Sequence, residues 1–452
     1  MKTAKRWFIA FVAIIILVLV FICSVNYFVD PYGYFRFQGG NYFELNDDYY
    51  TRVLKAERIK NFADEYDAYI IGGSKSSGIR ADSMEKFDGH KYYNSYIQSG
   101  NFEEYEKYIN YIFEQDDDVK KIMLCISSIE VKSYSRQDMG DTYVTPAQVD
   151  GRSKIAEVFK MLMKNLKVAD EETEKIDEGK TNPVAYPELP TGERNIGKYY
   201  DAVSLDPEWF EKRYVLYEQT KSEKEKGVKP ETYNFDLQLN KLFNEELEQS
   251  EDMKLCLEAL RRIKSVCDEN GAELSVLFVP SFISEMAVYE GPQFWNYYGE
   301  VVKIVGDVWD FSDYNDIILN PYNFYNYGHF FYDVGDLMLE TMKENKQVYS
   351  DKDETLFTHF GYHVYSDVAD CEKDDSELAI TVADYLAQRE KQYDILRKEY
   401  VVNGTIELKD YDDDSNVVKD SPYFDDESLK AREGREDNVR NVYEKTKDDY
   451  EY

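Results

Sequence analysis

Residues 68–79 read A-Y-I-I-G-G-S-K-S-S-G-I. The apolar run Ala68–Ile71 contains β-branched residues and ends at a pair of glycines, a pattern that predicts a buried strand. Gly72 and Gly73 allow a sharp turn where the strand ends, so Ser74 follows at the carboxyl edge of the sheet, where open α/β sheets bind ligands. Two interpretations stay open: Ser74 is a nucleophile, or it caps the helix of an ordinary strand-to-helix turn.

Apolar periodicity on either side of this stretch predicts an alternation of helices and strands. We expect helices at residues 46–66, 101–115, 252–269, 294–303, 334–346 and 375–402, and further strands at 120–126, 273–279 and 308–311. Such alternation is typical of a parallel sheet whose crossover helices cover both faces. The expected fold class is therefore α/β.

A segment without charged residues, Trp7–Phe28, precedes this region. As a helix it would span about 33 Å, enough to cross a bilayer. Lys2, Lys5 and Arg6 lie before it, and the positive-inside rule then places the N-terminus in the cytoplasm and the rest of the chain outside. The sequence near Ser24 lacks the small residues of a signal-peptide cleavage site, so we expect an uncleaved, single-pass anchor in the cell membrane.

The composition divides the chain into segments of different character. We expect a cytoplasmic N-terminus (1–6), a transmembrane anchor (7–28), an extracytoplasmic domain (29–365) with an insertion at about 135–235, a C-terminal helix (366–408) and a disordered acidic tail (409–452). The insertion contains Pro-bearing and Lys/Glu-rich runs. It is interpreted either as a lid or partner surface or as a solvated excursion without a chemical role.

Composition and charge limit the classes of partner. The 452 residues are 43% hydrophobic, enough for a sizeable core, and they carry a formal net charge of −35. A surface so acidic repels a phosphate backbone, so we expect no nucleic-acid partner. Aromatic clusters such as Tyr92-Tyr93 are open to two interpretations: rings that line a carbohydrate groove, or ordinary core residues.

The sequence holds four histidines, which limits the candidates for a general base. His329 follows the last expected strand, so it falls near the sheet edge that carries Ser74, and the two could form a nucleophile–base pair. The alternative is a histidine that only hydrogen-bonds a neighbour. His359 and His363 are four residues apart, but Gly361 lies between them and no Glu or Cys accompanies them, so we expect no metal site. No nucleotide-binding fingerprint is present and we expect no cofactor.

Several short motifs together resemble the SGNH/GDSL hydrolase superfamily. They are G-G-S at 72–74, D-F-S at 310–312 and N-F-Y-N-Y-G-H-F at 323–330. The anchor and D-P-Y-G-Y-F at 30–35 resemble the membrane-anchored branch that serves teichoic-acid D-alanylation and extracellular polysaccharide O-acetylation. The resemblance covers roughly residues 25–135 and 250–365. It implies a flavodoxin-like sheet, with Ser74 as nucleophile and His329 as the histidine of the Asp-x-x-His motif.

This chain departs from the family pattern at the other site positions. The acidic residue three before the histidine is replaced by Asn326, so Asp313 becomes an alternative acid, or Ser74 and His329 work as a dyad. Gly100 and Asn101 are the nearest oxyanion-hole candidates. They are equally explained as a turn residue and a helix cap.

The resemblance implies an extracytoplasmic acyltransferase or esterase that acts on a cell-envelope polysaccharide or teichoic acid. A multi-pass membrane O-acyltransferase is the expected protein partner. The competing interpretation is a non-catalytic, membrane-anchored scaffold of the same fold that supports such a partner or binds the envelope polymer.

Overall fold

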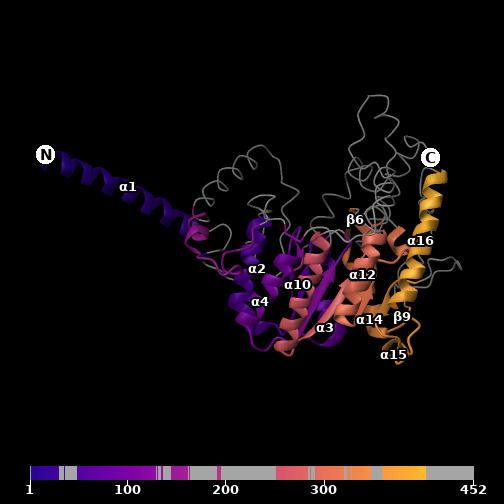
Figure 1. Cartoon of the computed structure of the whole chain (residues 1–452). Coiled ribbons are helices and arrows are strands. Elements are labelled where there is room, and N and C mark those ends of the chain that lie inside the picture. The colour runs from indigo at the N-terminus through magenta and orange to yellow at the C-terminus, as the bar shows by residue number, and fades with distance from the viewer. Residues whose placement is uncertain are drawn as a thin grey trace.

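A sheet of seven strands forms the centre of the folded chain (Figure 1). In chain order the strands are β1 (Ala68–Gly72), β2 (Tyr92–Tyr96), β3 (Lys121–Ile126), β4 (Glu273–Phe278), β5 (Asp307–Asp310), β8 (Tyr362–Tyr365) and β9 (Ala379–Thr381). Their order across the sheet is β2-β1-β3-β4-β5-β8-β9. The first five are parallel, β8 runs antiparallel to β5, and β9 is parallel to β8. The expected α/β class with a mostly parallel sheet is confirmed.

The structure, a computed structural model, describes part of the chain. The described residues are 2–29, 35, 48–128, 130, 134–135, 144–160, 162, 191–194, 251–282, 286, 291–319, 323–326, 328–347 and 359–403. The acidic tail expected at 409–452, most of the insertion at 135–235 and most of residues 30–47 lie outside these ranges.

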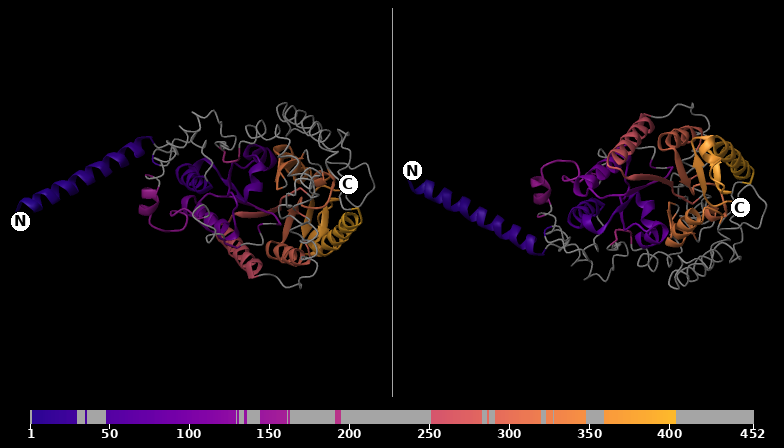
Figure 2. Two further views of the ribbon diagram at one scale, coloured as in Figure 1. Left: turned by 90° about the horizontal axis from the view of Figure 1, so that it is seen from above. Right: turned by 90° about the horizontal axis from the view of Figure 1, so that it is seen from below.

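Helices cover both faces of the sheet (Figure 2). They are α2 (Asp48–Phe62), α3 (Ala81–Asp88), α4 (Phe102–Gln115), α10 (Glu251–Glu269), α12 (Pro292–Val305), α14 (Tyr332–Glu344) and α16 (Val382–Asn403), with the short η1 (Ala63–Glu65), α13 (Asp316–Leu319) and α15 (Val368–Cys371). α10 packs between α4 and α12, whereas α3 packs against α14. Right-handed crossovers place α3 on one face and α4, α10 and α12 on the other. The chain moves across the sheet in one direction from β1 to β2 and in the opposite direction from β2 to β5.

The interior strands β1 and β3 are buried along their whole length, as expected for strands covered on both faces. β2 was not predicted as a strand, because Y-Y-N-S-Y has no aliphatic residue and does not alternate. All five of its residues are buried, including Tyr92 and Tyr93, so these rings belong to the core and not to a carbohydrate groove.

The region after residue 365 differs from the expectation of a single helix. β9 pairs with β8 and carries the sheet beyond residue 365, and α16 begins only at Val382. The buried Tyr385 and Arg389 attach α16 to the body. Residues to Asn403 therefore continue the α/β fold.

The N-terminal helix α1 (Lys2–Val29) projects away from the sheet (Figure 1). The most apolar 18-residue window of its segment Thr3–Phe28 has a mean hydropathy of 3.4, and none of this window is buried. Among the described residues this is the one helix that is long and apolar enough to span a membrane.

Candidate active site

Ser74 is the first residue of η2 (Ser74–Gly78), a 3₁₀ turn that follows β1 through Gly73. The N–H and the Oγ–H of Ser76 both donate to the Gly73 carbonyl oxygen, at 3.1 and 2.7 Å, which closes the turn. Ser74 is partly exposed, whereas the four residues after it are buried. The turn therefore presents the Ser74 hydroxyl where a substrate can reach it.

Asn94 of β2 holds the backbone of this turn. Its Nδ2 donates to the carbonyl oxygens of Ser76 and Ile79, at 2.9 and 2.8 Å, and its Oδ1 accepts from the Tyr96 N–H at 3.0 Å. These bonds satisfy a fully buried amide. Asn94 was not predicted as a site residue. The one signal for it in the sequence was a polar residue within a short, tyrosine-rich segment.

His329 lies on a two-stranded hairpin formed by β6 (Phe324–Asn326) and β7 (His329–Phe330). Asn326 stands opposite His329 in the register of this hairpin. The ring of His329 is partly exposed, and its Nε2 lies 2.7 Å from Ser74 Oγ. The structure thus brings together the two residues that the sequence analysis proposed as nucleophile and base.

Close packing between η2 and α14 joins these two distant segments. A Cβ atom at Gly335 would lie 2.5 Å from the Gly78 carbonyl oxygen, and a Cβ atom at Gly78 would lie 2.8 Å from the Phe330 ring. Arg80 forms an ion pair with the buried Asp336 on α14, and burial raises the pKa of Asp336 to about 6. The hairpin that carries His329 is therefore fixed against the turn that carries Ser74.

The sheet topology places this pair at a natural binding position. The chain leaves β1 for β2 on one side and later enters β3 on the other side of β1, so the connections diverge at the carboxyl end of β1. Ligands of open α/β sheets bind in the crevice at such a point. Ser74, two residues beyond the last residue of β1, lies at this point of divergence.

Of the two proposed partners of His329, Asp313 lies in a buried charged environment and Asn326 is described only in its backbone. Asp313 is fully buried beyond the end of β5, and the charged groups that act on it are Arg389 and Asp310. Burial raises the pKa of Asp313 to about 7 against the opposing effect of Arg389. The side chain of Asn326 lies outside the described part of the chain. Asp313 therefore belongs to a buried ionic cluster, and its role as the alternative acid stays a prediction.

Gly100 and Asn101, the oxyanion candidates, have structural roles. The Gly100 N–H donates to the Ile97 carbonyl oxygen at 2.9 Å and closes a turn. Asn101 is the N-cap of α4: its side chain accepts from the Glu104 N–H at 3.2 Å and donates to the Glu104 carboxylate at 3.0 Å. The turn and cap interpretations hold for these two residues.

Several buried polar residues surround the Ser74 turn, and these residues were not predicted from the sequence. Lys75 is buried and donates to Ser281 Oγ at 2.6 Å. Glu130, also buried, accepts from the Ser127 N–H at 3.1 Å. All follow the carboxyl ends of β1, β3 or β4, and polar residues directly after an apolar strand were the signal that could have found them.

The two histidines near residue 360 both stack on aromatic rings. His363 stacks on Trp309, with ring centroids 4.5 Å apart, and its Nδ1 lies 2.7 Å from Tyr365 Oη. His359 stacks on Tyr362. Among the described residues, no group of three or more His, Cys, Asp or Glu side chains could hold a metal ion.

The described pieces of the insertion pack onto the α/β body. The Asn94 N–H donates to the Thr191 carbonyl oxygen at 2.8 Å, next to the edge strand β2. Lys154 pairs with Glu57 of α2 at 3.0 Å. The expectation of a lid or partner surface stays a prediction.

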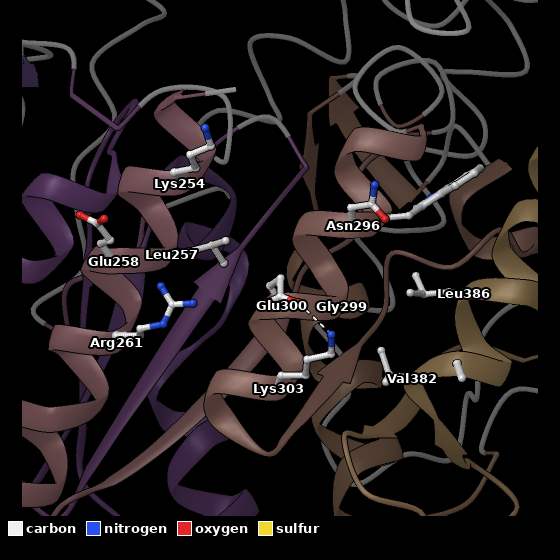
Figure 3. Close-up of a pocket in the computed structure, with 12 residues that line it drawn as sticks. Lys254, Leu257, Glu258, Arg261, Asn296, Gly299, Glu300, Lys303, Val382 and Leu386 are labelled. Carbon is white, nitrogen blue, oxygen red and sulfur yellow. Dashed lines mark hydrogen bonds and ion pairs between the residues drawn. The ribbon is translucent and has the colours of Figure 1, made fainter. Parts of the chain in front are cut away.

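A groove of about 770 Å³ lies between α10, α12 and α16, apart from the Ser74 site (Figure 3). Both signs of charge line it, and Lys303 pairs with Glu300 at 2.8 Å. Its lining contains neither Ser74 nor His329.

Comparison of the chain with protein-family models, with curated proteins and with solved structures finds no match.

Proposed function

We propose that the protein is a membrane-anchored serine acyltransferase or esterase that acts on acyl groups of a cell-envelope polysaccharide or teichoic acid. The observation that carries the proposal is the 2.7 Å separation between Ser74 Oγ and His329 Nε2. A serine hydroxyl bonded to an imidazole, with both groups partly exposed, is the arrangement that acyl transfer through a covalent intermediate needs.

The chemistry needs no cofactor, because every proton has a donor and an acceptor. Ser74 Oγ attacks the ester carbonyl carbon while His329 Nε2 takes the hydroxyl proton, and the imidazolium returns this proton to the departing alcohol oxygen. The acyl group then sits on Ser74. A hydroxyl of the acceptor polymer, or water, attacks the acyl-serine with His329 again as base, and the proton passes back to Ser74.

Two features support membership of the SGNH/GDSL type. The order β2-β1-β3-β4-β5 of the parallel strands is that of the flavodoxin-like doubly wound sheet. The G-G-S and N-Y-G-H motifs that suggested the resemblance lie side by side in space through Ser74 and His329. We assign the protein to the membrane-anchored branch of that superfamily on this basis, with a multi-pass O-acyltransferase as the partner that supplies the acyl group.

Asn326 favours a second candidate, a non-catalytic scaffold. An amide can accept a hydrogen bond from the imidazole but cannot stabilise an imidazolium by charge, and in serine proteases the equivalent exchange lowers kcat by about 10⁴-fold. On this alternative the triad has decayed, and the protein supports a membrane acyltransferase or binds the polymer.

Asn326→Asp separates the two candidates. If His329 is a working base, this variant should preserve the rate at which Ser74 reacts with a serine-directed phosphonate or raise it by up to about 10⁴-fold, because a carboxylate stabilises the imidazolium. The rate is measured by mass spectrometry of the Ser74 peptide, with Asn296→Asp, at an exposed amide on α12, as the control. An unreactive wild type together with a reactive Asn326→Asp variant would establish the scaffold.

The charges that flank α1 lead to a prediction about orientation. We propose a cytoplasmic N-terminus and an extracytoplasmic α/β domain. A cysteine introduced by Ser421→Cys should then be labelled by a membrane-impermeant maleimide on intact cells, in a Cys371→Ser background that removes a partly exposed native thiol. Labelling that appears only after lysis would reverse the orientation and exclude an envelope substrate.

A further inference from the structure

The glycine before the nucleophile is required by a contact and not by its backbone angles. Gly73 has φ −75° and ψ −172°, an extended conformation that any residue adopts. A Cβ atom built on Gly73 would lie 2.0 Å from Glu130 Oε1 and 2.9 Å from Glu130 Cδ. The carboxylate of Glu130 therefore rests directly on the Cα atom of Gly73, one residue before Ser74.

Glu130 is held in this place from its own side. Its N–H donates to the Ser127 carbonyl oxygen at 3.2 Å, while its Oε2 accepts from the Ser127 N–H at 3.1 Å, so the backbone and the side chain both close the turn after β3. The residue is 6% exposed. Burial raises the pKa of the Cys125 thiol on β3, and the Glu130 carboxylate adds a smaller effect in the same direction.

Lys75 supports the turn in a second direction. β3 lies between β1 and β4 in the sheet, so the Lys75 side chain must pass over the end of β3 to reach Ser281 Oγ at 2.6 Å. The residues on both sides of Ser74 are thus attached to the loops that follow β3 and β4.

We infer that Glu130 is a positioning residue for Ser74: its carboxylate fixes the Gly73–Ser74 backbone so that Ser74 Oγ stays within hydrogen-bond distance of His329 Nε2. This inference rests on the proposed function of Ser74. Displacement of a reacting group by about 1 Å can reduce a rate 10²-fold, so a contact of this kind has a measurable effect on reactivity.

The test is a double-mutant cycle of Gly73→Ala and Glu130→Ala on the full-length protein in detergent. Gly73→Ala should lower the maximal rate of Ser74 labelling by a phosphonate about 10²-fold, because the new methyl group collides with Glu130. Glu130→Ala alone should lower this rate about tenfold, because the Gly73–Ser74 backbone loses the carboxylate that fixes it. In the double variant the obstacle to the new methyl group is also gone, so it should react at about the rate of Glu130→Ala, at least about tenfold faster than Gly73→Ala alone. The phosphonate concentration for half-maximal rate should stay constant across the four proteins. Glu258→Ala, an exposed glutamate on α10, is the control.

A double variant that reacts no faster than Gly73→Ala would overturn the inference, because a glutamate with only a general structural role cannot relieve the first substitution. If the wild-type protein does not react at all, the proposed function fails. The thermal unfolding midpoints of the same four proteins then test the contact between Gly73 and the Glu130 carboxylate. A midpoint lowered by Gly73→Ala and raised again in the double variant supports the contact. Additive losses contradict it.

Discussion

His329→Ala should lower the rate at which Ser74 reacts with a serine-directed phosphonate by about 10² to 10⁴-fold, and Ser74→Ala should leave no labelled peptide. The His329 Nε2 atom lies 2.7 Å from Ser74 Oγ, close enough to take the hydroxyl proton during attack. Without this base the serine reacts as an ordinary alcohol, because its own pKa keeps it protonated at neutral pH. Labelling rates followed by mass spectrometry of the Ser74 peptide provide the measurement.

His90→Ala is the matched control for this experiment. His90 is also partly exposed, but its Nδ1 contacts Asp67, the residue just before β1, at the opposite end of that strand from Ser74. Its replacement should leave the labelling rate within about twofold of the wild type, since surface substitutions away from the site have small effects. Equal rates for His329→Ala and wild type would remove the histidine from the proposed chemistry and leave Ser74 as an unassisted nucleophile.

The proximity of Ser74 and His329 could be predicted from the sequence for two reasons. The run before Ser74 reads clearly as a buried strand, and the alternation of strands and helices implies a parallel sheet whose strands end at one edge. A residue after an early strand and a residue on a late loop then fall near each other. The observed distance between Ser74 Oγ and His329 Nε2 agrees with that prediction.

The supports of the site could not be predicted in the same way. Asn94 lies on a strand that has no aliphatic residue, so its segment gave no strand signal, and its partners are backbone carbonyl oxygens of another segment. Gly73 and Gly335 are indistinguishable in the sequence from glycines that allow unusual backbone angles. Only the folded structure shows that each is small because Glu130 or Gly78 occupies the space of a Cβ atom.

The oxyanion candidates were ambiguous for a different reason. Gly100-Asn101 precedes a helix, and the same two residues satisfy both a family motif and the ordinary chemistry of a helix N-terminus. Local hydrogen bonds decide between the two: Asn101 caps α4 and the Gly100 N–H is used within a turn. The sequence is compatible with both roles. It does not show whether these groups form hydrogen bonds within the chain or to a bound substrate.

Asp313 illustrates how burial changes the meaning of a candidate acid. Its surroundings contain the carboxylate of Asp310 on β5 and the guanidinium of Arg389 on α16, together with Tyr298 and Tyr385. Arg389 Nη1 lies 3.8 Å from Asp310 Oδ1, so one cation faces two carboxyl groups. The cluster is electrically balanced when Asp313 is protonated, and it carries an excess negative charge when Asp313 is ionised. Burial and, to a smaller extent, the repulsion from Asp310 raise the pKa of Asp313 to about 7, against the opposing effect of Arg389.

Asp313→Asn should consequently stabilise the protein at pH 8 and flatten the dependence of its stability on pH. With the wild type, the unfolded chain releases the Asp313 proton near pH 4, whereas the folded protein keeps it until about pH 7. Between these values the unfolded state binds fewer protons, so the free energy of unfolding falls as the pH rises, by about 4 kcal/mol from this group. Asparagine keeps the shape but cannot ionise, and the loss should disappear.

Urea unfolding of the detergent-solubilised protein at pH 5, 6, 7 and 8 measures this effect. Asp336, with a pKa raised to about 6 by burial, contributes a loss in the same direction between about pH 4 and 6, and this part should persist in Asp313→Asn. Because the Asp336 contribution is common to both proteins, the difference between them should grow from pH 5 to 7 and level off above the folded-state pKa of Asp313. Asp117→Asn, at an exposed position, is the control and should leave the profile of the wild type unchanged. A wild-type stability that rises from pH 5 to 8, with the same slope in Asp313→Asn, would mean that Asp313 is ionised in the folded protein and that Arg389 outweighs its burial.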